Sequence, residues 1–261
     1  MRCVIRLALL ICFAVAGLNM TPAEARRVAL VIGNAEHQFL PVLKNPVNDA
    51  TAMAEALEKL NFDKVILKKD LGIEGFRTAL RELSREAQGA EVGMIFFAGN
   101  GIQVDGRNYL IPVDAKLEKR SDVDLDAIRL ETVIEQLADA KLGLVILDAC
   151  RDDPFVSGRY VRGQNRGLHR GGSKGKGLAR IEPRHNLFLV YAAQPGAVAL
   201  DGVGHHSPFT EALLKHLPTP GLELRHLFIR VRSEVLAATG GQQGPHVDDS
   251  FLAEFYFKAA Q

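Results

Sequence analysis

A single cysteine in polar surroundings is the first candidate for chemistry in this sequence. Cys150 closes the segment Asp148-Ala149-Cys150 and precedes the polar turn Arg151-Asp152-Asp153-Pro154. A thiolate is a strong nucleophile, so a cysteine at the end of a strand can attack a carbonyl carbon. The alternative is structural, because a lone cysteine often packs as a small hydrophobic residue. Two other segments, Gly33-Asn34 and Gly99-Asn100-Gly101, also follow apolar runs and are candidates to lie beside it.

Alternating strand and helix patterns are expected to position these segments. Continuous apolar runs predict buried strands, and helical spacing of apolar residues predicts the helices between them. The predicted strands are 27–32, 65–67, 92–98, 144–147 and 186–193, with a hairpin at 104–110 and a last edge strand at 251–257. The predicted helices are 46–60, 73–87, 130–140, 208–216 and 223–238. This order predicts a mostly parallel sheet with helices on both faces, and ligands bind such sheets at the carboxyl ends of the strands.

Composition narrows the possible classes of protein. The 261 residues are 47% hydrophobic and 24% charged, the balance of a folded domain and not of a disordered tail or a fibre. A net charge of +1 gives no electrostatic attraction to nucleic acid or to anionic membranes. The acidic run at 122–126 lacks the glycine and glutamate of a calcium loop, and the glycine-rich run at 171–177 lacks the end of a phosphate-binding loop. We therefore expect no metal and no cofactor.

The first 25 residues predict an export signal. Arg2 and Arg6 precede an apolar run at 7–18, and Ala23-Glu24-Ala25 has the small-x-small pattern of a cleavage site. The apolar run is too short to span a bilayer as a helix, so no stable membrane span is expected after cleavage. The mature chain would be one domain, 26–261, located in the periplasm or secreted, with Cys150 as its one cysteine.

A basic segment interrupts the domain pattern. Residues 158–184 contain eight Arg or Lys, seven Gly and one acidic residue. Such a composition buries too little apolar surface to offset the entropy of ordering, so we expect a mobile loop.

Several motifs together resemble the caspase-like cysteine peptidases, in particular their metacaspase and orthocaspase branch. The resemblance extends from Arg26 to about Phe257, and the segments that carry it are 27–34, 43–50, 96–103, 108–115, 147–152, 199–202 and 207–210. It implies a three-layer sandwich around a mostly parallel six-stranded sheet. It also implies a Cys–His dyad, with oxyanion donors on the backbone of the cysteine and of the glycine after the histidine. Cys150 matches the nucleophile and Gly101 the second donor, but Asn100 stands where the family has histidine.

Asparagine cannot perform the proton transfers of that histidine. Its amide neither takes up nor releases a proton near neutral pH, and acid–base assistance is typically worth about 10²–10⁴ in rate. His37, His205 and His206 lie in loops that could face the site, although each is also explained as an ordinary surface histidine. His169 and His185 flank the basic loop and are weaker candidates.

The resemblance further implies a preference for Arg or Lys before the scissile bond. Asp148 and Asp201 match the acidic positions that select a basic residue in metacaspase-like enzymes, and a carboxylate pair suits a guanidinium. In the alternative interpretation Asp148 caps a turn and Asp201 serves a glycine-rich loop.

The leading hypothesis is an exported pseudo-peptidase that binds Arg/Lys-containing segments of a partner or of its own 158–184 loop. The second hypothesis is a residual cysteine endopeptidase that cleaves after Arg or Lys through Cys150. The third hypothesis is a small-ligand module on a Rossmann-like sheet, but no phosphate-binding motif in the sequence supports it.

Overall fold

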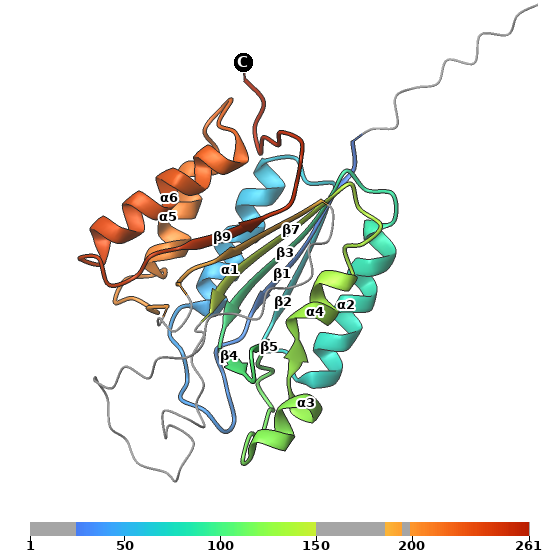
Figure 1. The fold of residues 1–261 in the computed structure, drawn as a ribbon, viewed down its shortest axis with the longest axis vertical. Coiled ribbons are helices and arrows are strands. Elements are labelled where there is room, and N and C mark those ends of the chain that lie inside the picture. The colour runs from blue at the N-terminus through green and yellow to red at the C-terminus, as the bar shows by residue number, and fades with distance from the viewer. Residues whose placement is uncertain (1–24, 150–185, 195–198, 261) are drawn as a thin grey trace, which may run out of the picture.

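The computed structural model describes residues 25–149, 186–194 and 199–260, and within them it has one large and one small sheet. The predictions for residues 1–24, for Cys150 and for the 158–184 loop lie outside the described residues. The large sheet has the strand order β2-β1-β3-β7-β8-β9 (Figure 1). Its strands are β1 (Arg27–Gly33), β2 (Lys64–Lys69), β3 (Val92–Gly99), β7 (Leu142–Ala149), β8 (Leu187–Tyr191) and β9 (His246–Asp249). All neighbours are parallel except the β8–β9 pair, which is antiparallel.

The three central strands β1, β3 and β7 form the middle of the core. Every residue of β3 and β7 is buried, as expected for continuous apolar runs covered on both faces. Their register pairs Gly33 with Ala98 and Gly99 with Ala149. The carboxyl ends of β1, β3 and β7 therefore lie side by side, as the sequence predicts.

Helices cover both faces of this sheet and complete a three-layer sandwich (Figure 1). One face, which includes Ala29 and Val31, packs against α1 (Pro46–Lys59), α5 (Pro208–His216) and α6 (Leu224–Ala238). The other face packs against α2 (Ile73–Ala87) and α4 (Leu130–Glu135). Helix α1 approaches the end of β1 so closely that a Cβ on Gly33 would lie 2.3 Å from the carbonyl oxygen of Pro46. A side chain at position 33 would push α1 away from the carboxyl ends.

A small sheet lies beyond the carboxyl end of β3. Its antiparallel strands are β4 (Gly101–Val104), β5 (Arg107–Leu110) and β6 (Ile128–Arg129). The short helices η1 (Arg120–Asp122) and α3 (Val123–Asp126) lie between β5 and β6 in the chain. The predicted hairpin turn is confirmed, because Asp105 and Gly106 have φ values of 50° and 78°.

Two predicted elements are corrected by the structure. The last strand is β9 and not 251–257, which makes only one isolated bridge, from Tyr256 to Glu223. Helix α4 ends at Glu135 and not at residue 140, and tighter bonds follow, such as Leu137 N–H to the Ile134 carbonyl at 3.0 Å. The remaining predicted elements occur within a few residues of their expected bounds.

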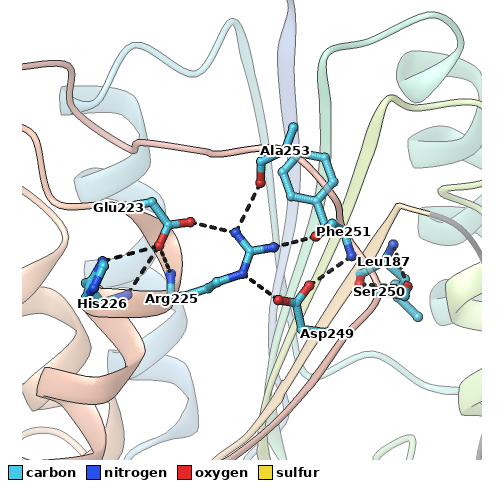
Figure 2. A network of polar contacts seen from close by, with 8 residues as sticks. All are labelled: Leu187, Glu223, Arg225, His226, Asp249, Ser250, Phe251 and Ala253. Atoms are coloured by element: carbon cyan, nitrogen blue, oxygen red, sulfur yellow. Dashed lines mark hydrogen bonds and ion pairs between the residues drawn. The ribbon is translucent and has the colours of Figure 1, made fainter.

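The guanidinium of Arg225 explains why the chain after β9 is not a strand (Figure 2). It donates to Asp249 at 2.7 Å, to Glu223 at 2.9 Å and to the carbonyl of Ala253 at 3.1 Å. It also donates to the carbonyl of Phe251. These carbonyls are thereby satisfied by a side chain of α6, and the segment turns toward the helix.

Across the described ranges, no helix is long and apolar enough to cross a membrane.

Candidate functional site

Asn100 lies directly after β3, between the large sheet and the small one. Its backbone carbonyl accepts a hydrogen bond from Ile111 N–H at 3.0 Å, and Gly101, the next residue, begins β4. The side-chain nitrogen of Asn100 is buried, and none of the described residues is its hydrogen-bond partner. Within that part of the chain, position 100 therefore presents an unsatisfied donor at the carboxyl edge of the sheet.

Asn34 has a different role from the one its position suggests. It is fully buried at the end of β1, and its side-chain nitrogen donates to the carbonyls of Leu71 and Ile111, both at 3.2 Å. Its side-chain oxygen accepts from Leu71 N–H at 2.9 Å. The Gly33-Asn34 segment is therefore a structural support beside Asn100.

Asp148 lies at the end of β7 and is buried, with 7% of its surface exposed. One carboxylate oxygen accepts hydrogen bonds from Ser207 Oγ and from Thr210 Oγ1, the latter at 2.8 Å. Burial raises the pKa of Asp148 to about 6, although the two hydroxyl donors act in the opposite direction. Asp148 thus belongs to a buried polar network, and the interpretation of it as a simple turn cap is too narrow.

Asp201 holds two loops together at the same edge. Its carboxylate accepts from the backbone N–H groups of Lys44 at 2.7 Å and Asn45 at 3.1 Å, just before α1. The Asn45 side chain donates in return to the Asp201 carbonyl at 2.6 Å. Gly202, with φ of 82°, then turns the chain back, and a Cβ there would lie 2.9 Å from the carbonyl oxygen of His206.

Asp49 is a member of the site that our sequence analysis missed. It lies in the first turn of α1, where the helix dipole favours an anion, and only 1% of its surface is exposed. Burial raises the pKa of Asp49 to about 8, and the nearby carboxylates of Asp148 and Asp201 raise it further, while the Ser207 N–H lowers it. The sequence does contain a signal for this residue, because Asp49 falls on the apolar face of α1 beside Ala50 and Met53. A charged residue on that face requires an explanation.

The three carboxylates and Asn100 line one cavity of about 40 Å³. Its lining residues are Leu43, Pro46, Asp49, Ala98, Gly99, Asn100, Asp148, Ala149, Ala199, Leu200, Asp201 and Ser207. A larger hollow of about 800 Å³ lies near Arg27 and Phe257, far from this edge, at the other end of β1. We place the site at the smaller cavity, because the polar groups predicted from the sequence converge there. Cys150 follows Ala149 in the chain and lies outside the described residues.

The histidines that could replace the missing one have other environments. His206 Nδ1 lies 2.8 Å from Asp49 Oδ1. His37 is 5% exposed, and burial lowers its pKa, opposed by the nearby carbonyls of Asn34 and Pro112 and by the charge of Asp70. His205 is exposed, and His169 and His185 lie outside the described residues. Neither His37 nor His205 lines the cavity.

This arrangement suits recognition of a positive charge. Three carboxyl groups converge, and burial raises the pKa values of Asp49 and Asp148, so a cation that entered would favour the ionised forms of these groups. Across the described ranges, no group of three or more His, Cys, Asp or Glu side chains has an arrangement that could hold a metal ion.

The fold and this edge of the sheet together define a caspase-type domain. The caspase domain model of the Peptidase_C14 family matches residues 26–256, so the chain belongs to that family. The chain is also 30% identical over 132 residues to mucosa-associated lymphoid tissue lymphoma translocation protein 1 from Homo sapiens, and 29% identical to its Mus musculus homologue. These matches cover 50% of this chain but only 16% and 15% of the two relatives. The caspase-like family predicted from the sequence is thereby confirmed, and its metacaspase and orthocaspase branch stays a prediction.

Proposed function

We propose that this chain binds peptide segments containing Arg or Lys and that its peptidase activity is severely impaired. The observation that carries the proposal is the lining of the cavity by Asn100 together with Asp49, Asp148 and Asp201. The carboxylates offer a site for a basic side chain, and the asparagine offers no proton transfer. In this proposal the chain is a pseudo-peptidase of the metacaspase or orthocaspase branch.

The proposed binding of a basic side chain rests on the burial and the charge of the carboxyl groups. Asp49 and Asp148 are buried, and both pKa values are raised by burial and by neighbouring carboxylates. A guanidinium or ammonium group would offset that repulsion, and a guanidinium can donate to two oxygens at once. A neutral or acidic side chain would have no such effect.

Measurements of peptide affinity test the proposed binding of a basic side chain directly. A peptide ending in arginine should bind the full chain more tightly than the same peptide ending in aspartate. Asp148→Asn, which keeps the side-chain shape, should reduce the difference strongly, and Asp201→Ala should do the same. Equal affinities of the wild type for both peptides would reject the acidic pocket.

The proposed loss of peptidase activity rests on the residue at position 100. Asn100→His should create peptidase activity directed to Arg or Lys, and adding Cys150→Ala to that variant should abolish it. If Asn100→His stays inactive toward arginine peptides that it binds, the histidine position is wrongly assigned.

A second candidate function is a residual cysteine endopeptidase that cleaves after Arg or Lys. It is favoured by the retained Cys150 and by Gly101, whose backbone N–H matches an oxyanion donor of the family. Cleavage of an arginine peptide by the wild type, lost in Cys150→Ala, would replace the pseudo-peptidase proposal with this one.

The basic segment 158–184 is a candidate occupant of the pocket in cis. It follows Cys150 closely in the chain and contains eight Arg or Lys residues. Replacing these eight by glutamine should tighten binding of an added arginine peptide if the segment competes for the pocket. An unchanged affinity would assign the pocket to a separate partner.

Export of the chain is part of the same proposal, based on the signal pattern in residues 1–25. The protein recovered from the periplasm or medium should begin at Arg26 by N-terminal sequencing. Soluble cytoplasmic protein that retains Met1 would contradict export.

A further inference from the structure

The contact between Asp49 and His206 is not explained by the role of either residue described so far. The Nδ1 atom of His206 lies 2.8 Å from Asp49 Oδ1, and the two side chains are 28% and 2% exposed. The next residue, Ser207, directs its backbone N–H at both carboxylate oxygens, at 3.3 and 3.4 Å. Two consecutive residues before α5, His206 and Ser207, thus contact one buried carboxyl group.

The charges around this contact are nearly all negative. Asp49 comes from α1, Asp148 from the end of β7 and Asp201 from the loop before His206, and both other acids raise the pKa of Asp49. The Lys44 ammonium group is directed elsewhere, to the carbonyl of Val203 at 2.7 Å, and His205 is exposed. Within the described part of the chain, His206 is the only basic side chain in ion-pair contact with Asp49.

The space beside these carboxylates is small. A cavity of about 40 Å³ has room for a few water molecules, since one water molecule needs roughly 10–15 Å³ of such space. An arginine side chain therefore requires that part of the lining moves. Ser207 and Asp201 line the cavity, and His206 lies between them in the chain, so displacing the His206 loop would both widen the cavity and free Asp49.

We propose that His206 is a built-in competitor for the acidic pocket: its imidazole ring contacts Asp49 when no substrate is bound, and a lysine or arginine side chain must displace it. The inference rests on the proposed binding of basic segments and specifies how that binding is regulated. A side chain at position 206 that does not reach Asp49 should therefore raise the affinity of the pocket for a basic segment.

The test is calorimetric titration of the full chain with a short capped peptide whose single charge is one arginine. His206→Ala removes the ring that contacts Asp49, and His205→Ala is the matched control in the same loop. We expect His206→Ala to bind the peptide about three- to tenfold more tightly than wild type, and His206→Gln, which keeps a donor for Asp49, to gain less. The control should bind the peptide as the wild type does.

The other outcomes separate this inference from the function on which it rests. If wild type and His206→Ala bind the peptide equally, the competition is wrong and the binding function stands. If His206→Ala binds more weakly, His206 positions Asp49 for the ligand and does not compete with it. If neither protein binds the arginine peptide, the proposed function fails, and this inference fails with it.

Discussion

Ser207 links the start of α5 to the buried carboxylate of Asp148. Its Oγ donates to Asp148 Oδ2 and at the same time accepts from Thr210 N–H at 2.9 Å, which makes Ser207 the N-cap of the helix. One hydroxyl therefore serves both the helix terminus and the site. Changes at the site are consequently transmitted to the packing of α5.

Ser207→Ala should destabilise the protein through both bonds. Loss of an N-cap and of one donor to a buried carboxylate together cost about 1–3 kcal/mol of unfolding free energy. Urea denaturation measures this loss, and Ser233→Ala on the exposed side of α6 is the control, expected within about 0.5 kcal/mol of wild type. If both variants unfold at the same urea concentration, the hydroxyl does not contribute to stability.

Asp49→Asn should change how stability depends on pH. The pKa of Asp49 is about 8 in the folded protein, against about 3.9 in an unfolded chain. The folded state thus binds a proton that the unfolded state has released, and stability from this group is lost as pH rises from about 4 to about 8. Asparagine cannot ionise, so the variant should gain about 2–5 kcal/mol relative to wild type between these limits.

Denaturation of both proteins at pH 5, 6.5 and 8 measures this effect. Asp139→Asn, at an exposed carboxylate, should have the pH profile of the wild type. Parallel curves for Asp49→Asn and wild type would show that Asp49 is ionised in the folded protein throughout.

The reactivity of Cys150 should reveal whether a cation activates it. With asparagine at position 100, the alkylation rate with iodoacetamide should still rise with pH through about 8 to 9, near the value of a free thiol. Asn100→His should lower the midpoint by about one unit or more, because an imidazolium stabilises the thiolate. A wild-type midpoint near pH 6 would show that another cation activates the thiol and would favour the residual-enzyme function.

Arg225→Lys should loosen the C-terminal segment that Figure 2 shows. Lysine keeps the charge but cannot replace a planar group that bonds Asp249, Glu223 and two backbone carbonyls. Because the side chain is 37% exposed, we expect a modest cost of about 1–2 kcal/mol. Amide exchange in β9 should accelerate in this variant and not in Arg232→Lys, where the arginine is exposed on the same helix. Unchanged exchange in β9 would mean that its pairing with β8 suffices.

The central sheet could be predicted because its strands are continuous apolar runs. Strand β9 could not, since it has the sequence His246-Val247-Asp248-Asp249, without a run, and forms by pairing with Tyr191 and its neighbours in β8. The apolar segment after it places Phe255 and Phe257 in the core without becoming a strand. Hydrophobicity alone therefore predicted burial correctly there but not the pairing.

The site was predictable to the extent that its residues end strands or lie in recognised motifs. Asn100, Asp148 and Asp201 do so, and the structure brings all three to one cavity. Asp49 lies in the segment 43–50 and on the apolar face of α1, but acidic residues in the first turn of a helix are common at the surface, so this position alone does not mark a site residue. Its role depends on the way α1 packs on β1.

The amide nitrogen of Asn100 has a consequence for what the side chain at position 100 contributes to the fold. Among the residues that the structure describes it has no partner, and a buried donor without one costs about 1–3 kcal/mol. The surrounding backbone is held by other groups, such as the Ile111 N–H that bonds the carbonyl of residue 100. The backbone hydrogen bond at residue 100 therefore does not depend on which side chain stands there.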